Sequence, residues 1–67
     1  MDEAAVSAVV TRFLRHISVS AQRELERALR QALASGAVQE GQTLTTAVTL
    51  SNDKLGLNVT IYSKLEL

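Results

Sequence analysis

Three arginines offer the clearest chemistry in this sequence, because their spacing places them on one face of a helix. Arg23, Arg27 and Arg30 stand at positions i, i+4 and i+7 of a segment rich in helix-forming residues. A row of guanidinium groups can contact nucleic-acid phosphates and base edges. The spacing therefore indicates a candidate nucleic-acid-binding face, of the kind that the second helix of a helix-turn-helix protein presents.

Charge balance weakens this interpretation. Glu24 and Glu26 interleave with the arginines, and the whole chain has no net charge, so no long-range field attracts a polyanion. A winged helix-turn-helix protein normally has a third helix, and the expected connector lacks the glycine often found in the turn. The sequence thus favours an ordinary solvent-exposed helix face, with nucleic-acid binding as the alternative function.

Catalytic and metal-binding residues are scarce. The chain has no cysteine and one histidine, His16, which cannot build a metal site alone. Glu24 and Glu26 do not share a helix face, so they form no carboxylate pair for acid–base chemistry. No glycine-rich phosphate loop or assembled nucleophile motif is present. We therefore expect no enzyme activity, no catalytic residue, no metal and no cofactor.

The hydrophobic period changes at Gly36, and this change predicts the elements that position the arginines. Upstream, apolar residues recur at helical spacing and predict helices over about 3–16 and 21–35. Asp2 is the expected N-cap of the first helix, and His16 its end. Ile17–Ser20 reads as a connector because it mixes β-branched residues with two serines. Ser20 is the expected N-cap of the second helix, and Gly36 its left-handed C-terminal residue.

Downstream of Gly36, apolar and polar residues alternate over about 43–50 and 57–66, which predicts two strands of a hairpin. The apolar sets are even-numbered in the first strand and odd-numbered in the second. They share one face only if the connecting loop has an even number of residues, such as 51–54 or 51–56. The residues expected to form the core or a dimer contact are Leu44, Val48, Val59, Ile61 and Leu65.

These elements predict one small α+β domain over 1–67, in the order ααββ. A chain this short without disulfides usually needs a further source of stability, and a two-stranded sheet leaves two unpaired edges. We therefore expect a homodimer, formed by strand pairing or by domain swapping. A partner protein that adds a strand is a third hypothesis. With no membrane-spanning run and no basic signal sequence, we expect a cytoplasmic location.

Two stretches of the helical half carry a family resemblance. They are Arg12-Phe13-Leu14-Arg15, at the end of the first helix, and the segment from Val19-Ser20-Ala21-Gln22 through Ala34-Ser35-Gly36. Together with the Thr-rich alternating C-terminal half, they resemble a family of short bacterial proteins of unknown function. The resemblance implies a helix–helix–hairpin protein and supplies no activity, cofactor or catalytic residue.

Overall fold

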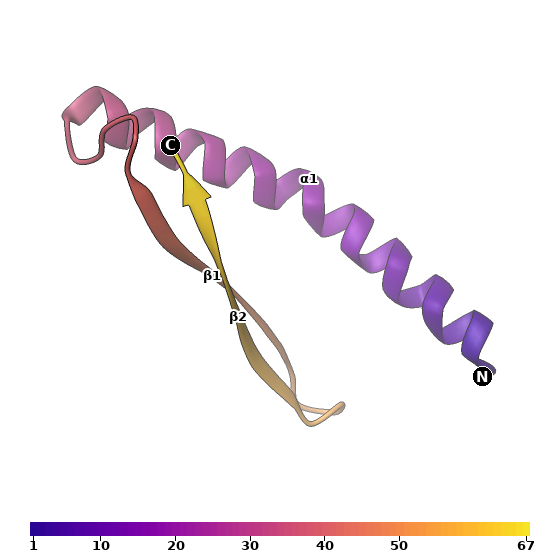
Figure 1. Cartoon of the computed structure of the whole chain (residues 1–67). Helices are drawn as coiled ribbons and strands as arrows, with labels where there is room; N and C mark the ends of the chain where they lie inside the picture. The colour runs from indigo at the N-terminus through magenta and orange to yellow at the C-terminus, as the bar shows by residue number, and fades with distance from the viewer. The chain divides into compact units, whose positions relative to one another are not determined.

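The computed structural model describes all residues, 1–67, and contains one α-helix followed by one antiparallel β-hairpin (Figure 1). The helix lies in one compact unit, Met1–Ala37, and the hairpin in a second, Val38–Leu67. The expected α+β class and the hairpin are therefore confirmed. The expectation that 1–67 forms a single domain stays a prediction.

Helix α1 spans Glu3–Ser35 without interruption, so the prediction of two helices separated at 17–20 is wrong (Figure 1). His16 and Ser20, expected at helix ends, both lie in its interior. Isoleucine, valine and serine each cost at most about 0.7 kcal/mol relative to alanine in a helix. Ending and restarting the helix would instead leave four N–H and four C=O groups without intrahelical partners. With no proline or glycine in this segment, continuation is the lower-energy solution.

The two ends of α1 confirm the expected caps. The Asp2 side chain accepts a hydrogen bond from the Ala5 backbone N–H at 2.8 Å, and the backbone of Asp2 is in an extended conformation. Gly36 ends the helix with φ of 80°, the left-handed conformation that a residue with a Cβ adopts only at a cost. The backbone N–H of Ala37 then donates to the Ala32 carbonyl at 2.9 Å. Helix α1 is therefore capped at both termini.

The hairpin consists of β1, Thr43–Asn52, and β2, Leu57–Glu66. Its register joins an even-numbered residue to an odd-numbered one at every pair, from Thr43 with Glu66 to Asn52 with Leu57. The connection, 53–56, contains four residues, so the expected even loop is confirmed, although neither proposed range was the right one. Gly56 closes the turn with φ of 62°, and its N–H donates to the Asp53 carbonyl at 3.1 Å.

Hydrogen bonds beyond the last strand pair also close the open end of the hairpin. The Gly41 backbone N–H donates to the Leu67 carbonyl oxygen at 3.0 Å, and the Leu67 N–H donates to the Gln42 carbonyl at 2.9 Å. The Gln42 side chain in turn accepts from the Gln39 N–H at 2.6 Å. The C-terminal residue is thus held by backbone hydrogen bonds to the segment that enters β1.

Candidate functional site

One face of the hairpin is mostly apolar and at least partly exposed, and the pair of Thr46 with Ser63 is its polar interruption. Its cross-strand pairs include Leu44 with Leu65 and Val48 with Ile61. We call this surface the apolar hairpin face, and it comprises Leu44, Val48, Leu50, Leu57, Val59, Ile61 and Leu65. All five residues predicted for the core or dimer contact lie on it. Val48, Val59 and Ile61 are exposed, whereas Leu44 and Leu65 are half-buried. Their role in a dimer stays a prediction.

The opposite face of the hairpin is polar. Thr49 and Thr60 are cross-strand partners, and their hydroxyl oxygens lie 3.2 Å apart in a hydrogen bond. Tyr62 lies opposite Ala47 on this same face and is exposed. The hairpin is therefore two-sided, with one face suited to water and the other suited to cover by apolar groups.

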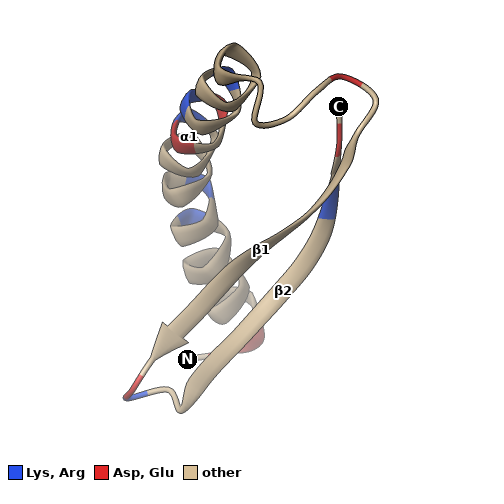
Figure 2. Cartoon of the chain, turned by 90° about the vertical axis from the view of Figure 1, so that its left-hand side faces the viewer, with Lys and Arg blue, Asp and Glu red and all other residues tan.

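The long edges of the hairpin carry few charges. Strand β1 has none, and the only charged residues of β2 are Lys64 and Glu66 near its end. Asp53 and Lys54 occupy the turn, so the charges gather at the two ends of the hairpin (Figure 2). Charges and prolines are the usual devices that block pairing at a sheet edge. The middle of each edge lacks them.

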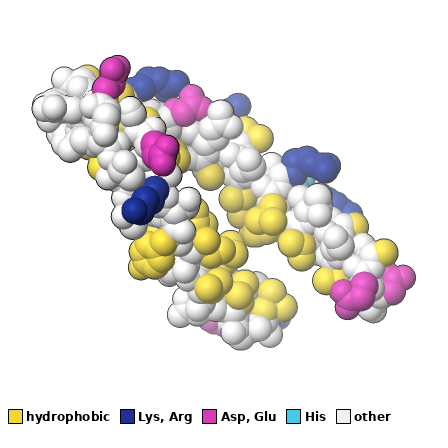
Figure 3. Space-filling view, in the orientation of Figure 1, with side chains coloured by type: hydrophobic (Ala, Val, Ile, Leu, Met, Phe, Trp, Pro, Cys, Tyr) yellow, Lys and Arg dark blue, Asp and Glu magenta, His cyan; other side chains and the backbone are white.

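Helix α1 carries a second exposed apolar surface. Seven of its large members, including Phe13 and Ile17, expose between 39% and 53% of their area, whereas Leu29 is half-buried. Apolar side chains gather along one side of the helix (Figure 3). We call this surface the apolar helix stripe, and it comprises Val6, Val9, Val10, Phe13, Leu14, Ile17, Ala21, Leu25, Ala28, Leu29 and Ala32. The stripe crosses the predicted connector without a break.

The continuity of the stripe has a signal in the sequence, although the prediction of two helices did not include it. Ile17, Ala21 and Leu25 follow one another at i, i+4 and i+8, the spacing of one helical face. Treating Ile17–Ser20 as a connector divided one stripe into two shorter ones. The uninterrupted helix also removes the turn that a helix-turn-helix protein needs, so that part of the alternative interpretation is wrong.

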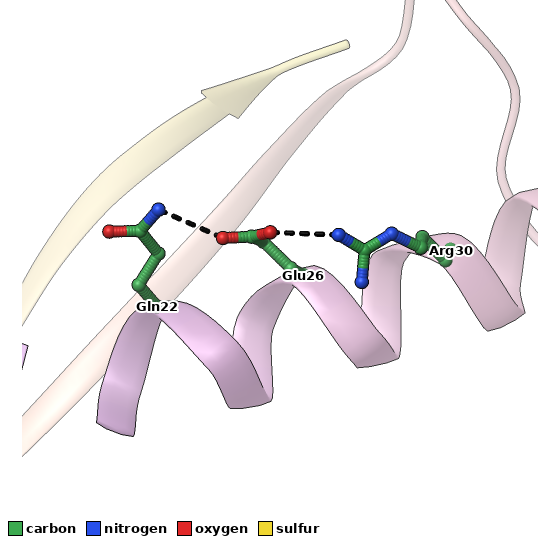
Figure 4. A network of polar contacts seen from close by, with 3 residues as sticks. All are labelled: Gln22, Glu26 and Arg30. Atoms are coloured by element: carbon green, nitrogen blue, oxygen red, sulfur yellow. Dashed lines mark hydrogen bonds and ion pairs between the residues drawn. The ribbon is translucent and has the colours of Figure 1, made fainter. Parts of the chain in front are cut away.

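The three predicted arginines lie near one another on α1: Arg23 and Arg30 on the side away from the apolar helix stripe, and Arg27 at its margin, in line with Val9. Arg27 donates to Glu24 at 3.0 Å, and Arg30 donates to Glu26 at 2.8 Å. Glu26 also accepts from Gln22 at 2.8 Å, which joins three side chains along the helix (Figure 4). Arg23 forms no ion pair. Carboxylates therefore compensate two of the three guanidinium charges.

No group of three or more His, Cys, Asp or Glu side chains is arranged to hold a metal ion. Helix α1 also lacks an apolar stretch of the length and hydropathy that a membrane-crossing helix requires. The two apolar surfaces are thus the most distinctive features available for an interaction.

The sequence matches the model of a protein family, described as a family of unknown function (DUF6494), over residues 1–67. No curated protein and no solved structure matches the chain. The family match covers the helix and the hairpin alike.

Proposed function

Since the chain belongs to DUF6494, a family of unknown function, its role has to be inferred from its surfaces, and we propose that it is a non-catalytic, homodimeric interaction module. The observation that carries this proposal is the exposure of large apolar side chains on both elements. Val10, Phe13 and Leu14 on the helix, and Val48 and Ile61 on the hairpin, are all exposed. A second copy of the chain is the partner that we propose for them.

An amphipathic helix and a lone two-stranded hairpin usually need further packing to be stable in water. Most of the stability of an amphipathic helix in a protein comes from packing of its apolar face, and a lone two-stranded hairpin is marginal. With no cysteine in the chain, disulfides make no contribution. Apolar contacts to α1 and to the hairpin are therefore needed to hold the fold.

The dimensions of the two elements favour a contact beyond one chain. Helix α1 has 33 residues and is about 50 Å long at 1.5 Å per residue. Each strand has 10 residues and spans about 33 Å. Both elements therefore offer long apolar surfaces to a second copy of the chain.

The apolar area available is of the size that a stable dimer needs. Seven large stripe residues and four hairpin residues are exposed: Val6, Val9, Val10, Phe13, Leu14, Ile17, Leu25, Leu57, Val48, Val59 and Ile61. At on the order of 80 Å² for each side chain, together they offer roughly 900 Å². Specific interfaces bury about 800 Å² on each partner. The exposed apolar area of the two surfaces together is thus comparable to that of a specific interface.

Two other functions remain as alternatives. Nucleic-acid binding through Arg23, Arg27 and Arg30 would use a face on which Glu24 and Glu26 compensate two of the three guanidinium charges. Strand addition by a different protein would use the uncharged middle of a hairpin edge. Neither alternative covers the apolar helix stripe. A bacterial origin and a cytoplasmic location are further parts of the proposal that rest on the sequence.

The concentration dependence of thermal unfolding tests the proposal. If a dimer is the folded species, the midpoint temperature of unfolding rises as the protein concentration is raised over several decades, because association is linked to folding. Circular dichroism at 222 nm follows the helix during this series. A midpoint temperature that is constant over the whole range would contradict the proposal.

A further inference from the structure

We infer that two copies of the chain pair through the apolar helix stripe, with their α1 helices antiparallel and a two-fold axis at the level of Val19. This inference rests on the proposed homodimer and adds its geometry. It follows from three properties of α1: the repeat of its apolar residues, the distribution of their sizes, and the position of its charges.

The apolar helix stripe repeats every eleven residues. Val6, Ile17 and Ala28 form one such series, and a second series and a shorter third follow it: Val10, Ala21, Ala32; and Leu14, Leu25. Eleven residues in three turns give 3.67 residues per turn, close to the 3.6 of a straight helix. A stripe with this repeat stays on one side of the helix along its length. It can therefore contact a second long helix from end to end.

Side-chain size changes along the stripe. The N-terminal half carries large residues such as Val10, Phe13 and Ile17, whereas three stripe positions in the C-terminal half are alanines, Ala21, Ala28 and Ala32. In a parallel pair, large residues would meet large ones at one end and alanine would meet alanine at the other. The distance between helix axes depends on the side chains at the contact, so such helices could not pack evenly.

An antiparallel pair removes this mismatch. Each large residue then meets a partner that lies equally far on the other side of Val19, and three of these contacts join a large residue to an alanine: Val6 with Ala32, Val10 with Ala28, and Ile17 with Ala21. Two more join Val9 with Leu29 and Phe13 with Leu25. Alternation of large and small residues across an interface fills space evenly. The match holds at five levels of the helix and fails at a sixth, where Leu14 meets Glu24.

Most charges of α1 lie outside the contact. Arg23 and Arg30 lie on the side away from the stripe, and Arg27 lies at its margin, in line with Val9 five turns earlier, so pairing brings no two guanidinium groups together. Two polar residues interrupt the repeat: Ser20, eleven residues after Val9, and Glu24, eleven residues after Phe13. Glu24 lies in line with Val6, five turns earlier, so the antiparallel pair places its carboxylate within the stripe. Its carboxylate is held by Arg27 at 3.0 Å, and its side chain is well exposed. Antiparallel helices also place opposite ends of their dipoles side by side.

Cysteine cross-linking tests the arrangement, because the natural chain has no cysteine. Two single variants are prepared, Val10→Cys and Ala28→Cys. Each is oxidised alone, and the two are also unfolded, mixed, refolded together and oxidised. In the antiparallel pair, Cys at position 10 of one chain faces position 28 of the other. In an antiparallel dimer of one variant, the two thiols are separated by 18 residues along the helix axis, about 27 Å, which a disulfide cannot bridge. A cross-linked dimer is therefore expected in the mixture alone.

Two further pairs of cysteine variants serve as controls for poor folding and for non-specific cross-linking. Val6→Cys with Ala32→Cys should repeat the result at another level of the helix. Arg12→Cys with Glu26→Cys occupies matching levels on the opposite side of α1 and should give no cross-link. Sedimentation of each reduced variant establishes whether it remains a dimer before oxidation.

The outcomes separate this inference from the proposed function. Cross-linking in each single variant would indicate parallel helices and overturn the inference. No cross-link in either mixture, from variants that keep the dimer mass, would also overturn it, while the homodimer would stand. A single-chain mass for the unmodified protein would overturn both.

Discussion

Val48 and Ile61 are direct cross-strand partners at the centre of the hairpin, and they expose 57% and 54% of their surface. An apolar cross-strand pair normally stabilises a sheet when other side chains cover it. In a single hairpin this pair is open to solvent. Self-association of two chains would cover this pair.

Replacing Ile61 with Asp should dissociate or unfold the protein. The substitution places a carboxylate in the apolar hairpin face, where cover by other side chains would bury it without a partner. Val59→Asp should act in the same way. We expect loss of the dimer mass in sedimentation and loss of cooperative thermal unfolding.

Thr60→Asp is the matched control, since Thr60 lies next to Ile61 on the polar face of the same strand. It removes one hydroxyl hydrogen bond with Thr49, which contributes on the order of 1 kcal/mol. The control should keep its dimer mass. If Ile61→Asp and Thr60→Asp behave alike, the apolar face is not the one that becomes covered.

Replacing Ser20 with Ala distinguishes one continuous helix from two. In the interior of α1, alanine is the better helix former, so the free energy of unfolding should rise by about 0.5 kcal/mol. At an N-cap, the same change would lower it by about 1 kcal/mol. Chemical denaturation measures the sign directly.

Asp2→Ala provides the comparison for a true cap. The Asp2 side chain accepts the Ala5 N–H at 2.8 Å, so its loss should cost about 1 kcal/mol. A destabilised Ser20→Ala variant, similar to Asp2→Ala, would contradict the single helix.

Replacing Arg23, Arg27 and Arg30 together with Ala tests the nucleic-acid alternative. The ion pairs of Arg27 and Arg30 are well exposed and contribute little, so the triple variant should fold and dimerise normally. We expect neither the natural chain nor the variant to bind a DNA duplex at physiological salt in a fluorescence anisotropy titration. Binding that falls steeply with salt and disappears in the variant would instead support the alternative.

Replacing Gly56 with Ala should destabilise the hairpin by roughly 1 kcal/mol, because φ of 62° is unfavourable for a residue with a Cβ. The added methyl group meets no other atom within 4 Å, so the cost comes from the backbone alone. Gly56→Asn should cost less, since asparagine tolerates the left-handed region better. Equal losses from both substitutions in thermal denaturation would contradict this explanation.

Much of the fold could be predicted from local patterns. Alternation of apolar and polar residues placed Leu44, Val48, Val59, Ile61 and Leu65 on one face, and the parity of their positions required an even loop. Asp2 and Gly36 predicted the helix ends, because Asp is a favoured N-cap residue and Gly readily adopts the left-handed conformation that ends a helix. These features depend on residues near one another in the chain, so the sequence contains enough information to predict them.

The continuity of α1 was the feature that local reasoning missed. Ile17, Val19 and the two serines have weak preferences against helix, and these preferences were given more weight than the apolar spacing from Leu14 through Ile17 and Ala21. Helix breaks require a stronger cause, such as proline or glycine. The role of the two apolar surfaces depends on what covers them, which is a property of an assembly and not of a local pattern.

Sedimentation equilibrium over a wide concentration range tests the central claim most directly, because it gives the absolute mass of the particle in solution. The account predicts twice the mass of the 7.2 kDa chain, maintained over most of that range. A single-chain mass at the highest concentration would contradict self-association and leave both apolar surfaces for a different partner.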